Sequence, residues 1–436
     1  MNCFPQVLPP IQKYGLVVYS ETKLYAIIFA RNFHRPPKIN SPAKESQRTA
    51  YGEEGKSPIE KLKELGYDLP QENITVREEP GASLKTVILV GGEGTRLQPL
   101  THYLPKSMVP VLNRPFLEHT IAYLEKYGIG EIILTLSYLP EVIQSYFGSG
   151  SSLGVQLTYA VENNPLGTAG AVKNTEQYLN STFVVLNGDI FTDLDISDML
   201  AFHRHKGAKA TIALSWVDNP SAFGVVETDN DGRVKRFIEK PSPNQASSNW
   251  INAGVYILEP EVLEYVPPNS HYMFERGLFP LLLKLDEPVY GYPFSGYWLD
   301  MGTPGKYLRL NCDLLLSKAK SALIEDLTRD GIHHDESATI HPSAEVVGPA
   351  VIGSGCKISP RVHIKGPAVI GPDCYIGEGA SVEGAVLWRD VNIGACAKLQ
   401  HCVVCHNARI ADNSQVINCT TTPDYVRTAQ FEDLGL

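Results

Sequence analysis

The sequence predicts an α/β domain built on a mainly parallel sheet, followed by a second domain of short, repeated parallel strands. Two patterns predict this architecture. Between residues 84 and 318, apolar runs of strand length alternate with segments of helical periodicity, which is typical of a parallel sheet with helices on both faces. After residue 336, aliphatic residues recur every six positions, a period that fits neither a helix nor a simple strand.

The expected elements of the α/β domain follow one another along the chain. Residues 86–90 form a strand that ends in a glycine-rich turn, and residues 116–127 carry leucine and isoleucine at helical spacing. Residues 132–136 and 183–186 are further strands of buried type, and residues 170–179 are a helix between them. In such sheets ligands bind beyond the carboxyl ends of the strands.

The repeat predicted for residues 336–420 is a triangular β-solenoid in which one aliphatic side chain for each face points inward. These positions are Ile340, Val346, Ile352, Ile358, Ile364, Ile370, Ile376 and Val382. The rhythm is interrupted near Trp388 and then resumes, which predicts a bulge or protruding loop there. Because flat solenoid faces favour self-association, we expect a homo-oligomer.

The remaining segments carry no recognisable chemistry. Residues 1–83 are expected to be a partly disordered N-terminal extension, since residues 32–56 are rich in proline, serine and charged residues. Residues 57–65 predict a short helix with a capping box. Residues 319–335 are expected to be a linker between the domains, and residues 421–436 a C-terminal tail.

The composition excludes several classes of protein. A formal net charge of −10 over 436 residues argues against a nucleic-acid partner, because binding to a phosphate backbone needs a basic surface. No apolar run approaches the roughly 20 residues that cross a bilayer, so no membrane partner is expected. No secretory signal is found, and we expect a cytoplasmic protein. Eight cysteines in a chain of this length do not form a disulfide framework.

The segment with the clearest chemistry is the turn GGEGTRL, which follows the first strand directly. Gly91, Gly92 and Gly94 allow backbone amides to approach phosphate oxygens closely. The spacing matches neither the Walker loop nor the dinucleotide-binding fingerprint. Two cations, Arg96 and Lys106, strengthen the interpretation of this turn as a phosphate site.

The turn and the residues after it resemble the signature of the nucleoside-diphospho-sugar pyrophosphorylases, which are sugar-1-phosphate nucleotidyltransferases. The matching positions are residues 91–97, Pro99, Thr101, Pro105-Lys106 and Val109-Pro110-Val111. The resemblance covers residues 84 to about 313. It implies a Rossmann-like nucleotidyltransferase domain followed by a left-handed parallel β-helix of hexapeptide repeats. The implied reaction joins a nucleoside triphosphate to a sugar 1-phosphate and releases pyrophosphate.

The resemblance also implies roles for individual residues. The nucleotide would be bound by Gly91, Gly92, Gly94, Thr95, Pro165, Gly167, Thr168 and Gly188. The sugar phosphate would be bound by Glu239, Lys240, Asn252 and Gly254. The catalytic residues would be Arg96, Lys106, Asp189 and Asp300, and the two aspartates resemble the acids that hold Mg²⁺. Asp189 also follows a buried strand and a glycine, which is a suitable position for a carboxylate that binds this ion.

The identity of the base and sugar depends on a shorter stretch. The sequence Leu-Gly-Thr-Ala-Gly at residues 166–170 resembles that of mannose-1-phosphate guanylyltransferases, so GTP and mannose 1-phosphate are the expected substrates. The alternative is a glucose-1-phosphate thymidylyl- or uridylyltransferase. A different class of function, a regulatory subunit that binds nucleotide-sugar without making it, is disfavoured because all four catalytic residues are present.

The repeat domain leaves two further alternatives. An acyltransferase site would need a general base, for which His363, His401 and His406 are available, although a lone histidine in a repeat is usually structural. A zinc site could use Cys402, Cys405 and His406, but Cys402 occupies a compact position of the repeat, which favours core packing.

Overall fold

The computed structural model describes residues 84–242, 245, 247–324 and 331–423, and the backbone of three further strands at residues 15–20, 23–28 and 425–427. The chain divides into two compact units, Met1–Gly81 and Ala82–Leu436. In the first unit, β1 (Gly15–Ser20) and β2 (Lys23–Ile28) form an antiparallel hairpin that was not expected from the sequence. The poorly ordered segment and the helix predicted for residues 32–65 lie outside the described residues.

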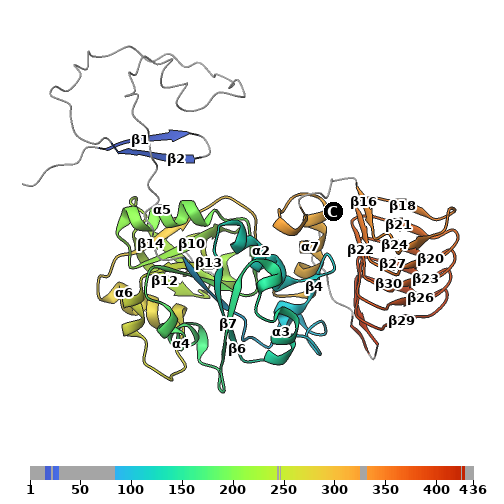
Figure 1. Ribbon diagram of the computed structural model, residues 1–436, viewed down its shortest axis with the longest axis horizontal. Coiled ribbons are helices and arrows are strands. Elements are labelled where there is room, and N and C mark those ends of the chain that lie inside the picture. Colours follow the sequence, from blue (N-terminus) through green and yellow to red (C-terminus); the bar gives the residue numbers. More distant parts are fainter. Residues whose placement is uncertain are drawn as a thin grey trace, which may run out of the picture. The chain divides into compact units, whose positions relative to one another are not determined.

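The first half of the second unit is built on a nine-stranded mixed sheet (Figure 1). Its strands are β3 (Lys85–Leu89), β6 (Glu131–Leu136), β7 (Gln156–Val161), β8 (Phe183–Asn187), β10 (Ala210–Trp216), β11 (Gly224–Thr228), β12 (Val234–Glu239), β13 (Trp250–Leu258) and β14 (Val289–Pro293). The order is β12-β11-β13-β8-β3-β6-β7, with β10 between β13 and β14. Strands β8, β3, β6 and β7 are parallel, whereas β13 pairs with β8 antiparallel, so the sheet changes direction beside β8.

Helices cover both faces of this sheet, as the alternation of strands and helices predicted. They are α2 (Phe116–Lys126), α3 (Pro140–Phe147), α4 (Gly167–Lys173), α5 (Ile196–Lys206), α6 (Phe279–Lys284) and α7 (Pro304–Leu315). Side chains of α2, α3 and α5 share one hydrophobic core with Ile88, while those of α4 and α6 share another with Val87. Successive residues of β3 thus face opposite layers, as the strand period requires. No helix in the described part of the chain has the length and apolarity needed to span a bilayer.

The predicted helix at residues 170–179 is displaced in the structure. Helix α4 begins three residues earlier, at Gly167, and ends at Lys173, and a separate 3₁₀ turn follows at Glu176–Tyr178. The hydroxyl of Thr175 donates to the carbonyl of Val172 at 2.8 Å. Such a local side-chain bond competes with continuation of the helix, which explains the early end.

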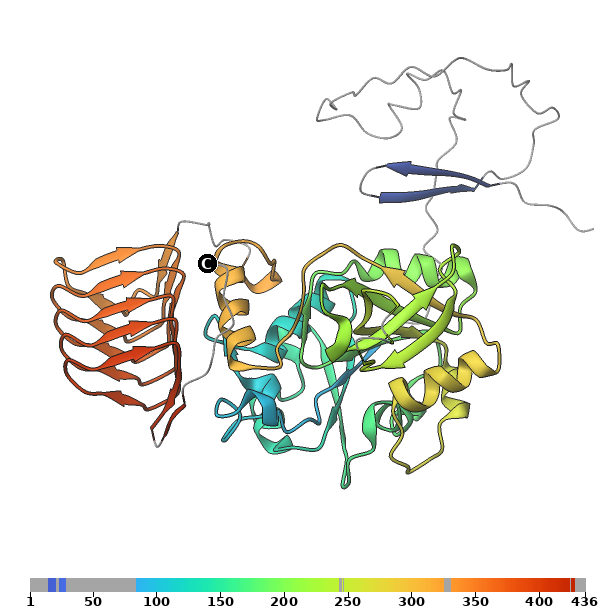
Figure 2. The same cartoon turned by 180° about the vertical axis from the view of Figure 1, so that it is seen from behind.

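The second half of this unit is a left-handed parallel β-helix, as predicted, and its coils are seen stacked in Figure 2. The first sheet holds β16 (Ile332–His334), β19 (Ala350–Ile352), β22 (Ala368–Ile370), β25 (Val386–Leu387), β28 (Val403–Val404), β31 (Thr420–Thr422) and the antiparallel β32 (Tyr425–Arg427). The second holds β17 (Thr339–Ile340), β20 (Lys357–Ile358), β23 (Tyr375–Ile376), β26 (Asn392–Ile393) and β29 (Arg409–Ile410). The third holds β18 (Glu345–Val347), β21 (His363–Lys365), β24 (Ser381–Glu383), β27 (Lys398–Gln400) and β30 (Gln415–Ile417).

The prediction of a bulge or protruding loop near Trp388 is wrong. Ile370 pairs with Leu387, which takes the inward position, and the ladder continues without an insertion. The rhythm changes because later coils are one residue shorter at the corner that precedes the first sheet. Where earlier coils have Gly-Pro, the later ones turn at Gly384, His401 and Asn418, all with positive φ.

Candidate active site

The glycine-rich turn after β3 is shaped by its contacts with the following segment. Gly94 has φ 64° and precedes a 3₁₀ turn, Thr95–Leu97. The hydroxyl of Thr101 donates to the carbonyl of Gly94 at 2.9 Å, and a Cβ on Gly94 would lie 3.1 Å from Cβ of Lys106. The absence of a side chain at Gly94 therefore lets the turn lie directly against the segment that carries Lys106.

A cavity of about 330 Å³ opens at the carboxyl ends of the parallel strands. It gathers six of the residues predicted to bind nucleotide with two predicted catalytic ones: Gly91, Gly92, Pro165, Gly167, Thr168, Gly188, Lys106 and Asp189. Three other predicted residues, Gly94, Thr95 and Arg96, belong to the same turn but do not line this cavity. The arrangement follows the rule that ligands bind where the strands of such sheets end.

The two predicted metal-binding acids meet at Lys106. Its Nζ lies 2.6 Å from Oδ2 of Asp189 and 3.8 Å from Oδ1 of Asp300. The acids are brought together by a short antiparallel pair, β9 (Ile190–Thr192) with β15 (Trp298–Asp300), and by a bond from the Met301 N–H to the Asp189 carbonyl at 3.0 Å.

Asp300 is the more enclosed of the two acids, with 8% of its surface exposed. Its Oδ1 is buried and accepts no hydrogen bond in the described structure. A buried carboxylate oxygen without a donor is costly unless a cation approaches it. The pair of acids therefore suits a divalent cation that takes one or two carboxylates and completes its coordination with water and phosphate oxygens.

Two more cations flank Asp300. Nζ of Lys306, on the first turn of α7, lies 3.8 Å from Oδ2 of Asp300 and 5.3 Å from the centre of the Phe223 ring. Arg96 is exposed and makes no ion pair with a described residue. A Cβ on Gly302 would lie 3.5 Å from an Nη atom of Arg96, which shows that the guanidinium reaches the Asp300 segment. The site thus holds three cations around two acids.

Of the residues predicted to bind the sugar phosphate, Glu239 ends β12, Lys240 directly follows it, and Asn252 and Gly254 lie on β13; none of them lines the cavity. The backbone N–H of Lys240 donates to the carbonyl of Phe223 at 3.0 Å, and Nζ lies 3.8 Å from Oε1 of Glu239. On β13, the N–H of Gly254 donates to Oδ1 of Asn252 at 3.0 Å.

Gly254 connects these strands to the cavity. It has φ 72°, and a Cβ there would lie 2.7 Å from Nδ2 of Asn187, which ends β8 and lines the cavity. A glycine is required at this position because a side chain would collide with Asn187 and strain the backbone.

Several polar residues of the site were not predicted from the sequence, among them Ser137, Glu162, Asn187 and Lys306. Three of them stand at or directly after the carboxyl ends of β6, β7 and β8, so the strand-end rule applied to every strand could have found them. Ser137 donates from Oγ to the Gly91 carbonyl at 2.6 Å, which fixes the glycine turn. Glu162 accepts the Leu166 N–H at 2.9 Å, and burial raises the pKa of its carboxyl group.

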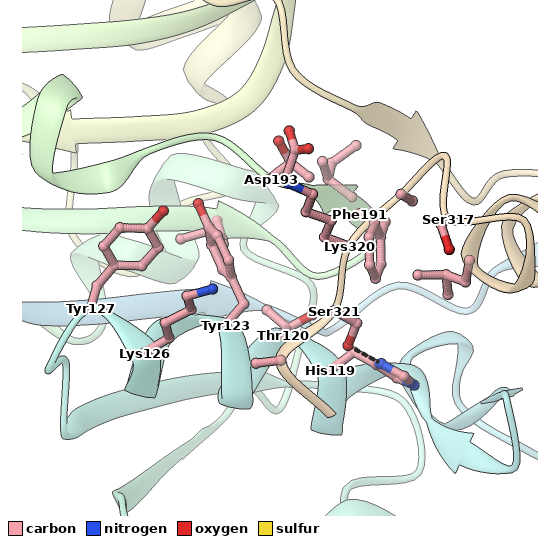
Figure 3. A pocket seen from close by; sticks show the side chains of 16 residues that line it. His119, Thr120, Tyr123, Lys126, Tyr127, Phe191, Asp193, Ser317, Lys320 and Ser321 are labelled. Carbon is pink, nitrogen blue, oxygen red and sulfur yellow. Dashed lines mark hydrogen bonds between the residues drawn. The ribbon is translucent and has the colours of Figure 1, made fainter. Parts of the chain in front are cut away.

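A larger cavity, of about 570 Å³, lies between α2, β9 and the segment after α7 (Figure 3). None of the predicted site residues lines it. His119 is hydrogen-bonded at its wall, with Nε2 2.9 Å from the Val111 carbonyl and Nδ1 2.8 Å from Oγ of Ser321. Since a carbonyl only accepts, Nε2 carries the proton and Nδ1 accepts from the serine. Burial lowers the pKa of His119 to about 4, so the ring is neutral near pH 7.

The histidines considered for acyl transfer have separate surroundings. His363 is exposed and lies 3.1 Å from Glu345, and His401 packs at the corner beside Gly384. The ring of His406 lies 4.7 Å from the Trp388 ring. The cysteines considered for zinc are separated too, because Cys402 packs inside the solenoid and Cys405 packs on its outside. In the part of the chain that the structure describes, no cluster of three or more histidine, cysteine or acidic side chains suits a metal ion.

Each of the two domains of the second unit matches a known protein family. Residues 85–317 match the nucleotidyl transferase family, and residues 329–427 match the LbH domain of the EIF2B subunit epsilon.

Curated relatives cover much of the chain. A mannose-1-phosphate guanylyltransferase of Mycobacterium tuberculosis is 38% identical over 71% of this chain and 81% of its own length. A UTP–glucose-1-phosphate uridylyltransferase of Synechocystis is 36% identical over 72% of this chain and 86% of its own length. A mannose-1-phosphate guanyltransferase of Candida albicans is 39% identical over 60% of this chain and 73% of its own length. The chain therefore belongs to the nucleotidyl transferase family, and it carries a left-handed β-helix behind the catalytic domain.

Proposed function

We propose that the chain is a mannose-1-phosphate guanylyltransferase, which makes GDP-mannose and pyrophosphate from GTP and mannose 1-phosphate. The observation that carries the proposal is the position of Lys106, between Asp189 and Asp300 and against the glycine turn. That constellation combines a phosphate-binding turn with a cation and two metal-binding acids. Guanylyltransferases in Mycobacterium and Candida, at 38% and 39% identity, support the choice of substrates.

The proposed reaction is a displacement at the α-phosphorus of the triphosphate. An oxygen of the sugar phosphate attacks, the new P–O bond forms, and the bond to the bridging oxygen of the β-phosphate breaks. Pyrophosphate leaves with that electron pair. Since no covalent intermediate on the protein is required, catalysis consists of positioning and charge stabilisation. In this proposal Arg96 and Lys106 stabilise the leaving pyrophosphate, while Lys240 and Lys306 offset repulsion between the two anionic substrates.

Enzymes of this family generally use a divalent metal ion, and we propose Mg²⁺ held by Asp189 and Asp300. The fit rests on the buried Oδ1 of Asp300, which has no hydrogen-bond donor in the described structure. When bound, the ion would neutralise phosphate charge beside the reacting centre. Lys106 contacts both acids, so it can keep their charges compensated until substrate and ion arrive.

Glu162 supports guanine as the base. Glu162 lines the cavity, and among the described residues its Oε2 accepts the Leu166 N–H while its Oε1 has no hydrogen-bond partner. A carboxylate accepts two hydrogen bonds side by side, and guanine presents two adjacent donors, N1–H and the 2-amino group. Uracil and thymine present a single ring N–H. A uridylyl- or thymidylyltransferase, the alternative, would gain less from an acid at this position.

We further propose that the protein acts in the cytoplasm as a homo-oligomer formed through the β-helix. Two aliphatic side chains of its third sheet, Val347 and Ile417, are exposed at 49% and 43%. They lie on the two outermost strands of that sheet, where an exposed apolar side chain suits contact with another copy. Light scattering during size-exclusion chromatography measures the subunit number, and a monomer at micromolar concentration would contradict this part of the proposal.

The experiment that tests the activity measures pyrophosphate release with Mg²⁺, one of GTP, dTTP, UTP, ATP and CTP, and either mannose or glucose 1-phosphate. We expect the fastest release with GTP and mannose 1-phosphate, and its loss in Asp189→Ala. Asp231→Ala is the matched control, because that aspartate is exposed and pairs with Lys206. Faster release with UTP or dTTP and glucose 1-phosphate would favour the alternative. No release with any pair, from a folded protein that binds nucleotide, would favour a regulatory subunit.

A further inference from the structure

We infer that the β-helix supports the active site, and that Trp388 of the solenoid is a positioning residue for Lys106 and Asp300. It acts through Tyr307, which joins the two segments that carry those residues. The inference goes beyond the proposed function and rests on it only for the activity measurements. Trp388, which directly follows β25 of the solenoid, thus has a role in the catalytic domain.

A hydrogen-bonded chain links the two domains. Nε1–H of Trp388 donates to the hydroxyl of Tyr307 at 2.9 Å, and that hydroxyl donates to the carbonyl of Pro110. Both side chains are buried, Trp388 with 4% and Tyr307 with 0% of its surface exposed. The Tyr307 hydroxyl has one proton, which it donates to the Pro110 carbonyl. Its oxygen also has lone pairs that accept hydrogen bonds, and the indole N–H of Trp388 is the donor to one of them. Removing the indole N–H leaves a buried oxygen undersatisfied.

Two members of this hydrogen-bonded series, Pro110 and Tyr307, lie close in the sequence to catalytic residues. Pro110 opens β4 (Pro110–Val111), four residues after Lys106, and β4 follows the 3₁₀ turn that begins at Lys106. Tyr307 lies on the first turn of α7, where its N–H donates a hydrogen bond to the carbonyl of Thr303 at 2.9 Å. The helix begins directly after the segment that carries Asp300. The hydroxyl of Tyr307 therefore ties the Lys106 segment to the Asp300 segment.

A second residue of α7 makes the same connection. Oδ1 of Asn311 accepts the Leu112 N–H at 2.9 Å, and Nδ2 donates to the Tyr307 carbonyl at 2.9 Å. Asn113, next in the chain, donates from Nδ2 to the Ile370 carbonyl of the solenoid at 3.0 Å. The loop after Lys106 is thus bonded both to α7 and to the β-helix.

Apolar packing joins the same three parts. One buried cluster contains neighbours of the catalytic residues, Leu97 and Met301, together with solenoid side chains on the first sheet. The solenoid members are Val369, Val386, Trp388, Val403 and Cys405. Helix α7 lies beside β22 of this sheet (Figure 1). Because a close-packed cluster transmits small displacements, the first sheet of the solenoid helps to define where Arg96 and Asp300 lie.

The indole ring is itself held in place. The Tyr307 ring packs edge-on against it at 6.3 Å, and the His406 ring lies 4.7 Å away. The carbonyl of Trp388 accepts a hydrogen bond from the thiol of Cys374 in the neighbouring coil. These contacts direct the indole N–H toward Tyr307, which suits a positioning role.

The test compares Trp388→Phe, Tyr307→Phe and the double variant, with Trp216→Phe as the matched control. Trp216 is 57% exposed on β10, so the control removes an indole N–H that bonds no part of the interface. We expect Trp388→Phe to lower kcat about three- to tenfold with little change in KM for either substrate, the effect of one buried hydrogen bond. The double variant should be no slower than Tyr307→Phe, because the acceptor is already lost.

A second measurement does not depend on activity. Amide hydrogen exchange should rise in residues 105–113 and 300–307 of Trp388→Phe, while β6 in the parallel sheet keeps its protection. The inference is overturned if exchange in those two segments is unchanged, if exchange rises throughout the protein, or if the two substitutions act independently on kcat. If no substrate pair gives turnover in the wild-type protein, the proposed function fails, and the exchange measurement still decides the positioning role.

Discussion

The ammonium group of Lys106 lies 2.6 Å from Oδ2 of Asp189, and this contact organises the centre of the site. The same group is 3.8 Å from Asp300, so one cation compensates both acids. A triphosphate that enters the cavity competes with the acids for this cation, and the acids are then free to bind a metal ion. We therefore expect substrate binding to raise the affinity for the metal ion, and metal binding to raise the affinity for the substrate.

Lys106→Met should lower kcat about 100- to 1,000-fold, because a cation at the developing charge of pyrophosphate is lost from an enclosed site. Lys106→Arg should recover part of the activity, since it keeps the charge with a different shape. Lys365→Met is the matched control, because that lysine is exposed on the β-helix and pairs with Glu383. Rates for Lys106→Met within threefold of wild type would contradict the role of Lys106.

Asp300→Asn should raise the Mg²⁺ concentration needed for half-maximal rate by about tenfold or more, because the site loses one of its two anionic ligands. Removal of metal ions with EDTA should abolish pyrophosphate release in the wild-type protein, and added Mg²⁺ should restore it. The rate is measured against Mg²⁺ concentration at saturating substrates. An unchanged Mg²⁺ dependence in Asp300→Asn would remove Asp300 from the metal site.

Glu162→Gln should reduce the preference for GTP over UTP by about tenfold or more, since an amide replaces one of two acceptor positions with a donor. The values of kcat/KM for the two nucleotides are compared in each protein. Glu176→Gln is the control, because Glu176 pairs with Lys173 on the surface. If the ratio is unchanged while both values fall together, Glu162 supports the loop through Leu166 and does not select the base.

Much of the fold could be predicted from local patterns. The strand before the glycine turn, the helix at residues 116–126 and the inward positions of the solenoid all follow from periodicity, because burial of one face imposes the period. The direction of β13 could not be predicted in this way. A buried strand has the same composition whether it runs parallel or antiparallel, and its direction is set by the path of the chain between strands.

The site was predictable where a motif carries it and not where folding brings distant residues together. Arg96 and Lys106 stand out beside the glycine turn, whereas Lys306 has no motif of its own and reaches Asp300 only through the start of α7. Trp388 was visible in the sequence as an interruption of the repeat. Its contact with Tyr307 depends on the packing of the two domains, which no local pattern records.

His119 should make stability depend on pH between about 4 and 6.5. Burial lowers the pKa of its ring from 6.5 to about 4 in the folded protein, so the unfolded chain takes up a proton at higher pH. Stability is therefore intact above about pH 6.5 and falls as the pH decreases toward 4, by up to about 3 kcal/mol for this group.

His119→Gln isolates this contribution from those of other groups. Glutamine can donate to the Val111 carbonyl and accept from Ser321 as the neutral ring does, but it does not take up a proton. The thermal unfolding midpoint is measured for both proteins from pH 7.5 to 4.5, and other titrating groups, such as His203 beside Glu259, cancel in the difference. We expect the wild-type midpoint to fall more steeply below pH 6.5 than that of the variant. A constant difference across the range would mean that His119 titrates alike in the folded and unfolded chains, contrary to its burial.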